Sequence, residues 1–452
     1  MIDAATIPST AAARPIGRCV RLAALVALAL CLALPYPAFA EVRTSDLILG
    51  ETAEAQGLDA GALPDISAPY AAVMGADGTF YYERDAGTQV KIASVTKIMT
   101  AIVALDNAEA DTVITVNETA AGMPGAASDL EAGDTMTLEN ALIGLLIPSG
   151  NDAAVAIGTS VGALIDPSSA DPLQTFVDAM NAKAAELGLD DTFFENPHGL
   201  DNYLWEGGHH STARDVAKMA HAAMENELIR SIVGDGDADM VVTGADGTER
   251  TIHLEDVNAL IGQNGNIGVK TGETRAAGLC FAGAWERDGE EFYTVVLGCA
   301  DREVRFQDSL GLADWYDAHT VPVPAVVTDR ETASGDPLVA QIAATAWTDK
   351  SVNVTVAEDE RTVEAFDLAG EIGYEIELDE VASDVSEGDS VGSVVVTQDG
   401  DAIAEVDLVA AENVPEPSPV EWVMVQFDRL VRMVSGQPQH AETVCYAKES
   451  AA

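Results

Sequence analysis

The sequence predicts an α+β fold over residues 45–319, a small all-β domain over residues 326–412 and an amphipathic helix over residues 418–436. In the first region, strand-like patterns lie at both ends and helix-like patterns lie between them. The composition changes at residues 320–325 (TVPVPA), a Pro-containing linker, after which apolar and polar residues alternate at period two. Helical spacing returns only after residues 415–417 (PEP).

The N-terminal residues 1–40 have the pattern of an export signal. Three arginines precede the apolar residues 22–34, and residues 38–40 (AFA) form a small-residue cleavage site. Cleavage after Ala40 would release a mature protein outside the cytoplasm. An uncleaved membrane anchor is the alternative, although the apolar run is short for a bilayer span.

Local patterns define the elements of the region 45–319. Residues 70–84 alternate around Asp77-Gly78 and predict a hairpin. Helical spacing predicts helices over residues 94–108, 138–147 and 308–316, and another that begins at Ala153. Consecutive antiparallel strands are expected over residues 265–274, 279–285 and 292–299.

The C-terminal part predicts a β domain and then a helix. Strands are expected over residues 352–356, 372–378, 393–397 and 403–409. In the helix of residues 418–436, apolar residues share one face and charged residues the other, and the segment is too short and too charged to span a bilayer. We expect it to lie in the membrane interface; packing against the β domain or a partner is the alternative. Residues 437–452 are expected as a tail.

Acidic residues greatly outnumber basic ones, with Asp+Glu 75 against Lys+Arg 23 and a formal net charge of −52. A chain this acidic offers no basic patch to a nucleic-acid backbone, which excludes that class of partner. Hydrophobic residues make up 48% of the chain, so the charge does not indicate disorder. We interpret the acidity as a heavily solvated surface suited to a salty exterior.

Two cysteines flank the hairpin expected around Gly289. Cys280 and Cys299 face each other if the turn is centred on Gly289-Glu290, and miss each other if it is centred on Asp288-Gly289. A disulfide and two small buried thiols both fit the sequence.

The first of three short motifs pairs a nucleophile with a base. Ser94 and Lys97 stand three residues apart at a predicted helix start, which stacks their side chains on one face. The Lys97 amine can take the Ser94 proton if burial and a second cation, Lys270, lower its pKa. This spacing is common by chance, so its weight depends on the other two motifs.

The second and third motifs supply a proton relay and an anion anchor. Ser149 can pass a proton towards a leaving amine, and Asn151 can hold Lys97 and a substrate amide; both lie in a break between two helices. On a predicted strand, Lys270 and Thr271 can bind a substrate carboxylate, and Gly272 lets a substrate backbone lie along the strand edge. The backbone N–H groups of Ser94 and Glu273 can form an oxyanion hole. Together the motifs predict acyl transfer through a serine ester.

The ordered motifs resemble one enzyme family. Residues 92–100 (IASVTKIMT), 148–154 (PSGNDAA) and 269–272 (VKTG) are similar to the three motifs of low-molecular-weight penicillin-binding proteins that act as D-alanyl-D-alanine carboxypeptidases. Residues 196–201 (NPHGLD) and 211–215 (STARD) resemble the segment between the second and third motifs. The β domain and terminal helix match the family's layout, so the resemblance covers nearly the whole mature chain.

The resemblance implies a penicillin-binding, β-lactamase-like transpeptidase domain over residues 45–319. It implies that Ser94 is the acyl-ester nucleophile, Lys97 the proton acceptor, Ser149 and Asn151 the second-motif pair, and Lys270 the residue that binds the substrate carboxylate. The expected reaction removes the terminal D-alanine from peptidoglycan pentapeptides at the outer face of the cytoplasmic membrane, with no cofactor. The expected partners are stem peptides, β-lactams and, through the helix, the membrane surface.

Two other function classes remain open. A β-lactamase on a related fold would release hydrolysed penicillin quickly, but no deacylating Glu motif is recognisable and the appended β domain argues against it. A non-catalytic wall-binding scaffold would not release D-alanine, but three intact motifs argue against that class.

One residue departs from the family pattern, and three histidines suggest other chemistries. Glu273 follows the third motif where relatives often carry an aromatic residue or His, and an inward carboxylate would repel an anionic substrate. His198 suggests a Ser-His triad, but the Ser-Lys pair already supplies a base, so we expect His198 to hold its loop. His209-His210 has no third ligand at a supporting spacing, so no metal is expected.

Overall fold

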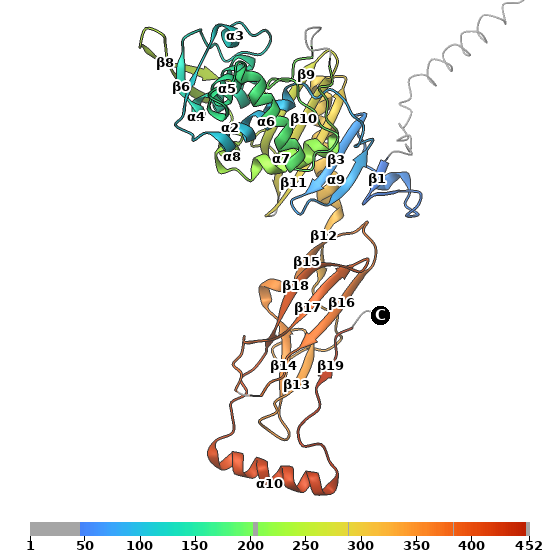
Figure 1. The fold of residues 1–452 in the computed structure, drawn as a ribbon. Helices are drawn as coiled ribbons and strands as arrows, with labels where there is room; N and C mark the ends of the chain where they lie inside the picture. The colour runs from blue at the N-terminus through green and yellow to red at the C-terminus, as the bar shows by residue number, and fades with distance from the viewer. Residues whose placement is uncertain (1–45, 202–206, 288, 383, 449–452) are drawn as a thin grey trace, which may run out of the picture.

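We describe a computed structural model of the chain, which covers residues 46–448 except residues 202–206, 288 and 383. The predicted export signal of residues 1–40 lies outside the described residues. Figure 1 shows an upper α+β part, here called the head (residues 46–319), and an elongated β part below it, here called the stalk (residues 320–448). A single helix lies across the far end of the stalk.

The head is built on an antiparallel sheet whose described strands run in the order β2-β1-β4-β3-β11-β10-β9. The strands are β1 (Asp46–Ile48), β2 (Glu51–Thr52), β3 (Tyr70–Gly75), β4 (Phe80–Arg84), β9 (Asn266–Thr274), β10 (Gly278–Arg287) and β11 (Glu290–Cys299). The predicted hairpin and the three predicted late strands are therefore confirmed, and the strand of the third motif, β9, lies at the sheet edge with one side unpaired by other strands.

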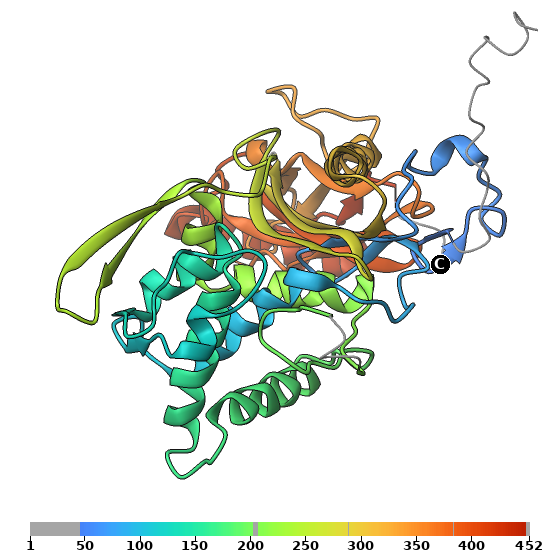
Figure 2. The same ribbon diagram turned by 90° about the horizontal axis from the view of Figure 1, so that it is seen from above.

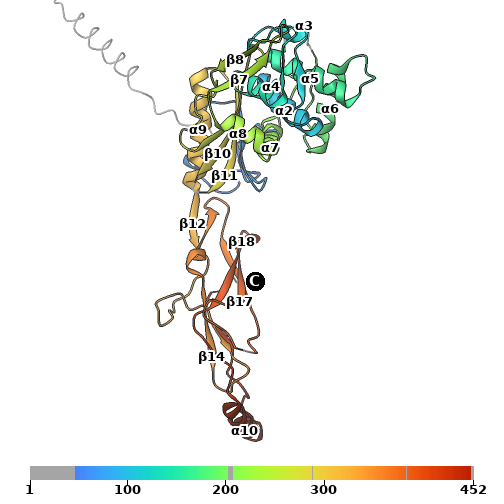
Figure 3. The ribbon, with the colours of Figure 1, turned by 90° about the vertical axis from the view of Figure 1, so that its left-hand side faces the viewer.

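Helices cover both faces of this sheet. Helix α9 (Arg302–His319) packs on one face, whereas α7 (Ala213–Met224) and α8 (Glu227–Gly234) lie on the other (Figure 3). The remaining described helices of the head are η1 (Ala60–Ala62), η2 (Ala93–Thr96), α2 (Lys97–Asn107), α3 (Glu118–Ala121), α4 (Leu138–Leu146), α5 (Asn151–Ile165) and α6 (Pro172–Glu186). Several boundaries differ from expectation. The first helix begins as the 3-10 turn η2, α5 begins at Asn151 rather than Ala153, and α9 spans Arg302–His319 rather than residues 308–316. Helix α9 begins at Arg302 because Asp301 accepts a hydrogen bond from the Glu303 N–H.

A second antiparallel sheet in the head was not predicted. It joins β5 (Val113–Thr115), β6 (Thr135–Thr137), β7 (Ala238–Thr243) and β8 (Glu249–Leu254). Figure 2 shows the β7–β8 hairpin extending away from the main sheet.

The two cysteines of the head form no disulfide among the described residues. The β10–β11 register pairs Arg287 with Glu290, and at the other end it pairs Leu279, rather than Cys280, with Cys299. Burial raises the pKa of the Cys280 thiol to about 11 and that of the Cys299 thiol to about 12, as expected for small buried side chains.

The stalk is an all-β domain, as predicted. Its main sheet runs in the order β16-β17-β18-β14-β13-β19, and β12 pairs with β15 in a separate ribbon. The strands are β12 (Thr320–Pro324), β13 (Ala340–Ala343), β14 (Ser351–Val356), β15 (Thr362–Phe366), β16 (Ile372–Leu378), β17 (Ser390–Gln398), β18 (Asp401–Ala410) and β19 (Val444–Cys445), with the 3-10 turn η3 (Glu358–Glu360) before β15. The expected linker of residues 320–325 is thus mostly a strand; its prolines are tolerated because β12 pairs on one side only.

Aromatic side chains join the stalk to the head. Phe366 at the end of β15 is buried against Tyr81, Trp315 and Tyr316, with ring centroids 4.8, 5.5 and 6.2 Å away. Beside this cluster, His319 donates from Nδ1 to Asp367 at 2.7 Å.

The terminal helix α10 (Pro419–Ser435) is held at both of its ends. Ser418 caps its start, and Trp347 Nε1 donates to the Pro415 carbonyl just before it. After the helix, the segment expected as a tail returns to the stalk, where β19 pairs with β13. Among the described residues, no helix combines the length and apolar character that a bilayer crossing requires.

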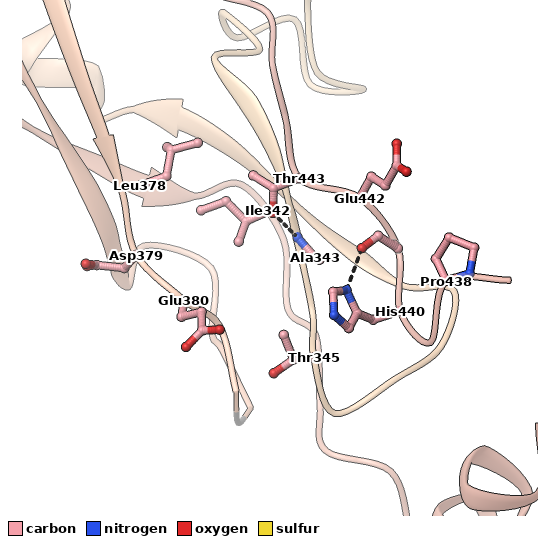
Figure 4. Close-up of a pocket in the computed structure, with 11 residues that line it drawn as sticks. Ile342, Ala343, Thr345, Leu378, Asp379, Glu380, Pro438, His440, Glu442 and Thr443 are labelled. Atoms are coloured by element: carbon pink, nitrogen blue, oxygen red, sulfur yellow. Dashed lines mark hydrogen bonds between the residues drawn. The ribbon is translucent and has the colours of Figure 1, made fainter. Parts of the chain in front are cut away.

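The returning segment encloses a pocket of about 580 Å³ against the stalk (Figure 4). Ala343 N donates to Thr443 Oγ1 at 3.1 Å, and His440 Nδ1 donates to the Ala441 carbonyl at 2.9 Å. The Ala343–Thr443 contact and the β13–β19 pairing fix the chain that leaves α10 against the sheet, whereas the His440 contact is local to the returning segment.

Candidate active site

Ser94 and Lys97 meet at the start of helix α2, inside the head. The Lys97 amine lies 2.8 Å from Ser94 Oγ, and the Lys97 side chain has no solvent exposure. Ala93, directly before Ser94, has a φ of 48°, a left-handed conformation that is strained for a residue with a Cβ. This strained turn brings Ser94 to the mouth of the site while Lys97 stays buried behind it.

Three further oxygens surround the Lys97 amine. They are Asn151 Oδ1 at 2.7 Å, the His198 carbonyl at 3.2 Å and Ser149 Oγ at 3.4 Å. Burial, followed by the positive charge of Lys270, holds the Lys97 pKa well below its usual value, against the opposing charge of Asp152. The first two motifs therefore converge on one amine that favours its neutral form.

The second motif is a tight turn that leads into helix α5. Ser149 has a φ of 67°, again left-handed, and Gly150 has no room for a side chain because a Cβ there would lie 2.7 Å from the Gly144 carbonyl. The Asp152 carboxylate accepts hydrogen bonds from Ser128 N at 2.9 and 3.0 Å, which ties the turn to the loop between α3 and β6. Ser149 and Asn151 are thus held in place by the backbone around them.

Strand β9 brings the third motif against η2. A Cβ on Gly272 would lie 2.6 Å from the Ile92 carbonyl and 3.2 Å from Ser94 N. The predicted reason for this glycine was room for a substrate backbone, whereas in the structure the space is used by the protein's own turn. The absent side chain lets Ser94 lie directly beside β9.

Lys270 is also buried, with 1% of its surface exposed. Its ammonium donates to the Thr271 carbonyl at 3.3 Å. Burial lowers its pKa to about 7, with Asp256 opposing the shift and Arg305 adding to it. The side chain is therefore poised to gain or lose a proton near neutral pH.

The sequence analysis missed Arg305. This arginine of α9 is buried, donates to the Gly272 carbonyl at 3.3 Å, and its Nε has no hydrogen-bond partner among the described residues. A buried guanidinium with an unsatisfied donor favours an anionic ligand. The sequence signal that could have identified Arg305 is its helical spacing with Ser309 and Leu312, which places it on the buried face of α9. The predicted helix began only at Asp308, so this spacing was not recognised.

Glu273 does not point its charge into the site. Its carboxylate pairs with Arg302 at 2.6 Å, and its side chain is about half exposed, at 48%. The expected repulsion of an anionic substrate required an inward carboxylate, and the Glu273 carboxylate instead pairs with Arg302 near the surface.

The loop of residues 196–201 positions a carbonyl rather than a histidine base. Asn196 Oδ1 accepts hydrogen bonds from His198 N at 3.1 Å and Gly199 N at 2.6 Å, and His198 Nδ1 accepts one from Leu200 N at 3.1 Å. Burial lowers the His198 pKa well below its usual value, so its ring is neutral. His198 holds its loop, and its carbonyl contacts Lys97.

His209 also has a local role. Its Nδ1 accepts a hydrogen bond from Glu195 N at 3.1 Å and its Nε2 donates to Thr96 Oγ1 at 2.8 Å. Burial lowers its pKa to about 3. This neutral ring links the loop to η2, the turn that carries Ser94.

Two family models match the chain. The model described as D-alanyl-D-alanine carboxypeptidase matches residues 58–301, more than half of the chain. The model described as penicillin-binding protein 5, C-terminal domain, matches residues 336–416 in the stalk.

Individual proteins agree with these matches. The D-alanyl-D-alanine carboxypeptidase DacF of Bacillus subtilis is 28% identical over 74% of this chain and 82% of its own. A D-alanyl-D-alanine carboxypeptidase of a Streptomyces strain is 32% identical over 53% of this chain and 82% of its own. Among solved structures, a Streptomyces DD-transpeptidase has a TM-score of 0.53 at 31% identity and covers 56% of this chain and 98% of its own. A Francisella tularensis DacD structure, at 24% identity and a TM-score of 0.52, shares the fold over 78% of this chain and 94% of its own.

Proposed function

We propose, since the chain belongs to the D-alanyl-D-alanine carboxypeptidase family, that Ser94 is the nucleophile with which it removes the terminal D-alanine from peptidoglycan stem peptides. The observation that carries this assignment is the buried Lys97 amine 2.8 Å from Ser94 Oγ. The enzyme is a serine hydrolase that acts outside the cytoplasm and binds β-lactams as its family does.

Lys97 acts as the general base in acylation. A neutral amine has two hydrogens and one lone pair. The hydrogens go to Asn151 Oδ1 and the His198 carbonyl, at 2.7 and 3.2 Å, which leaves the lone pair for the Ser94 hydroxyl proton. The Ser94 oxygen then attacks the carbonyl between the two D-alanines and forms the tetrahedral intermediate.

The other motifs stabilise and resolve this intermediate. The backbone N–H groups of Ser94 and Glu273 hold the oxyanion. The proton on Lys97 passes through Ser149, whose Oγ is 3.4 Å away, to the leaving amine, and the terminal D-alanine departs. Lys270 and Thr271 bind its carboxylate.

Arg305 adds a second cation to the carboxylate end of the site. It is buried, and its NH1 donates to the Gly272 carbonyl at 3.3 Å. Its unsatisfied Nε provides a charged donor that a carboxylate can fill.

Water completes the cycle. The water molecule gives a proton to Lys97 and attacks the Ser94 ester, which releases the shortened peptide and restores the serine hydroxyl. A β-lactam acylates Ser94 in the same way and deacylates slowly.

Mass spectrometry and D-alanine release test the assignment together. Wild type is expected to gain one penicillin adduct, mapped to the Ser94 peptide, and to release D-alanine from an N-acylated D-Ala-D-Ala peptide. Ser94→Ala should lose both, whereas Ser168→Ala, at an exposed serine, should keep both. Equal labelling of wild type and Ser94→Ala would overturn the assignment.

Two further outcomes distinguish the alternatives. Fast release of hydrolysed penicillin without D-alanine would favour a β-lactamase. Penicillin labelling without D-alanine release would favour a non-catalytic scaffold.

We also propose export through residues 1–40 and association of α10 with the outer face of the membrane. The helix exposes an apolar face that includes Val420 at 71%, Phe427 at 69% and Val434 at 81%. Its arginines are engaged elsewhere: Arg429 donates to the Thr345 carbonyl and Arg432 to Asp428. Binding therefore depends on apolar insertion rather than on attraction to anionic lipid headgroups.

Vesicle co-sedimentation tests the membrane proposal. The mature chain should bind zwitterionic phosphatidylcholine vesicles, and the double variant Val423→Asp/Phe427→Asp should remain in solution with unchanged peptidase activity. Equal binding of the two proteins would contradict the proposal.

A further inference from the structure

The site imposes a direction on the bound peptide, and this inference rests on the proposed function. Lys270 and Thr271 hold the terminal carboxylate, and Glu273 N lies at the scissile carbonyl. The peptide therefore runs along the edge of β9 from its C-terminus at Lys270 towards its N-terminus at Thr274. Because an extended chain advances by about 3.4 Å per residue, the stem residue before the penultimate D-alanine lies next to Arg275.

A pocket opens beside the β9–β10 turn that contains Arg275. It measures about 620 Å³ and lies next to the residues that precede Ser94. Its lining includes two cations, Arg275 and Lys91, together with Val90, Leu279 and Tyr70. Both cations are therefore available to one ligand that occupies this pocket.

Backbone groups of residues 207–209 hold the Lys91 ammonium, and the Lys91 side chain also lines the pocket. It donates to the Gly207 carbonyl at 2.9 Å and to the His209 carbonyl at 2.7 Å. An ammonium has three hydrogens, so one remains for a ligand. These neutral partners leave its positive charge uncompensated.

The charge pattern of the head makes this pair unusual. Most arginines of the head pair with a carboxylate: Arg84, Arg214, Arg230, Arg250, Arg287 and Arg302. Among the described residues, neither Arg275 nor Lys91 has such an ion pair, although acidic residues number 75 against 23 basic ones. The described cations of the head that lack a carboxylate partner are Lys97, Lys270 and Arg305 within the site, Lys91 and Arg275 beside it, and Lys218.

We propose that Arg275 and Lys91 form an anion subsite for the acyl donor. The subsite binds a carboxylate carried by the stem residue that precedes the penultimate D-alanine. Lys270 and Arg305 hold the carboxylate at the C-terminal end of the peptide. Arg275 and Lys91 hold a second carboxylate upstream of the scissile bond. Two anchored carboxylates align the scissile carbonyl over Ser94.

Three matched peptides test the subsite. They are N-acetylated tripeptides that end in D-Ala-D-Ala and begin with L-glutamate, L-glutamine or L-lysine. Wild type should hydrolyse the glutamate peptide with a kcat/KM about three- to tenfold above that of its glutamine isostere, the range for one partly exposed charged contact. The lysine peptide should be the poorest, because its ammonium faces two cations.

The variants test which residues produce the preference. In Arg275→Gln the ratio of kcat/KM for the glutamate peptide to kcat/KM for the glutamine peptide should fall towards one. In Arg275→Gln/Lys91→Gln the preference for glutamate should be lost. Lys218→Gln is the matched control, since Lys218 contacts the Gly188 carbonyl away from the site, and it should keep the wild-type ratio. Raising the salt concentration should reduce the ratio in wild type and leave the double variant unchanged.

The outcomes separate this proposal from the proposed function. A wild-type ratio of one, or a ratio that survives both substitutions, overturns the subsite while the peptidase assignment stands. Absence of D-alanine release from all three peptides refutes the proposed function, and the subsite with it.

Discussion

Lys97 and Lys270 have opposite protonation requirements in one small volume. In the proposed mechanism, Lys97 must be neutral to accept the Ser94 proton, and Lys270 must be charged to bind a carboxylate. Burial depresses the pKa of both amines, and the charge of Lys270 further depresses that of Lys97. The pair therefore works only while Lys270 keeps its proton and Lys97 has lost its own.

A bell-shaped pH profile of kcat/KM follows. Activity should rise as pH increases through the lowered pKa of Lys97, because the neutral base accumulates. It should fall as pH increases through the Lys270 pKa of about 7, because the cation is lost. Lys270→Arg should move the alkaline limb upwards by about two or more pH units, at a lower maximal rate, because the guanidinium stays charged. An unmoved alkaline limb would assign it to another group.

Glu273 provides a second prediction for a single residue. Its carboxylate pairs with Arg302 and is half exposed, so its effect on the substrate carboxylate is screened. Glu273→His should change kcat/KM by less than about threefold, within the range of an exposed ion pair. Arg302→Gln, which removes the partner instead, is the matched control. A tenfold gain in Glu273→His alone would show that the carboxylate does oppose substrate binding.

Packing between β9 and η2 decides whether the site assembles. Gly272→Ala would place a Cβ 2.6 Å from the Ile92 carbonyl and push the nucleophile away from the strand. Since a displacement of about 1 Å can cost about a hundredfold in rate, acylation by penicillin should slow by about that factor. Gly87→Ala, at a glycine with no atom within 4 Å of its ideal Cβ, should acylate normally. Normal acylation by Gly272→Ala would mean that η2 can move without loss.

The elements that were predicted have strong local patterns, but not every local element was recognised: the β7–β8 hairpin around Asp246-Gly247 was missed, as were strands held by distant pairings. The β3–β4 hairpin and the β9–β11 strands have turn residues and alternation that can be read within a few residues. By contrast, β6 pairs with β7 through Thr135 and Thr243, and β13 pairs with β19 through Ala340 and Cys445. Such short strands carry no signal of their own, because their partners lie about a hundred residues away along the chain.

The same distinction holds in the active site. Ser94, Lys97 and Lys270 lie in motifs, so their chemistry could be inferred from spacing and order. Arg305 is recruited by the packing of α9 on the sheet, and the His198 carbonyl by a loop, neither of which has a motif. The pairing of Glu273 with Arg302 likewise depends on where α9 begins.

The whole molecule depends on the aromatic junction between the head and the stalk. Phe366 is buried among Tyr81, Trp315 and Tyr316, and its removal leaves a cavity at the joint. Phe366→Ala should lower the free energy of unfolding by about 3 kcal/mol. Calorimetry should show one transition in wild type and two in the variant, as the two parts lose their coupling. The control variant Phe193→Ala, at an exposed phenylalanine, should leave a single transition. A single transition at an unchanged temperature in Phe366→Ala would contradict the coupling of head and stalk through Phe366.

The return of the chain after α10 has a geometric consequence. A helix joined to a rigid body through one strand can swivel about that joint, whereas a helix joined at two points keeps at most a hinge axis. The Trp347 contact before α10 and the β13–β19 pairing after it are two such points. With α10 lying in a lipid surface as proposed, the stalk and head would tilt about one axis at most, which limits how the opening of the site can be inclined to that surface.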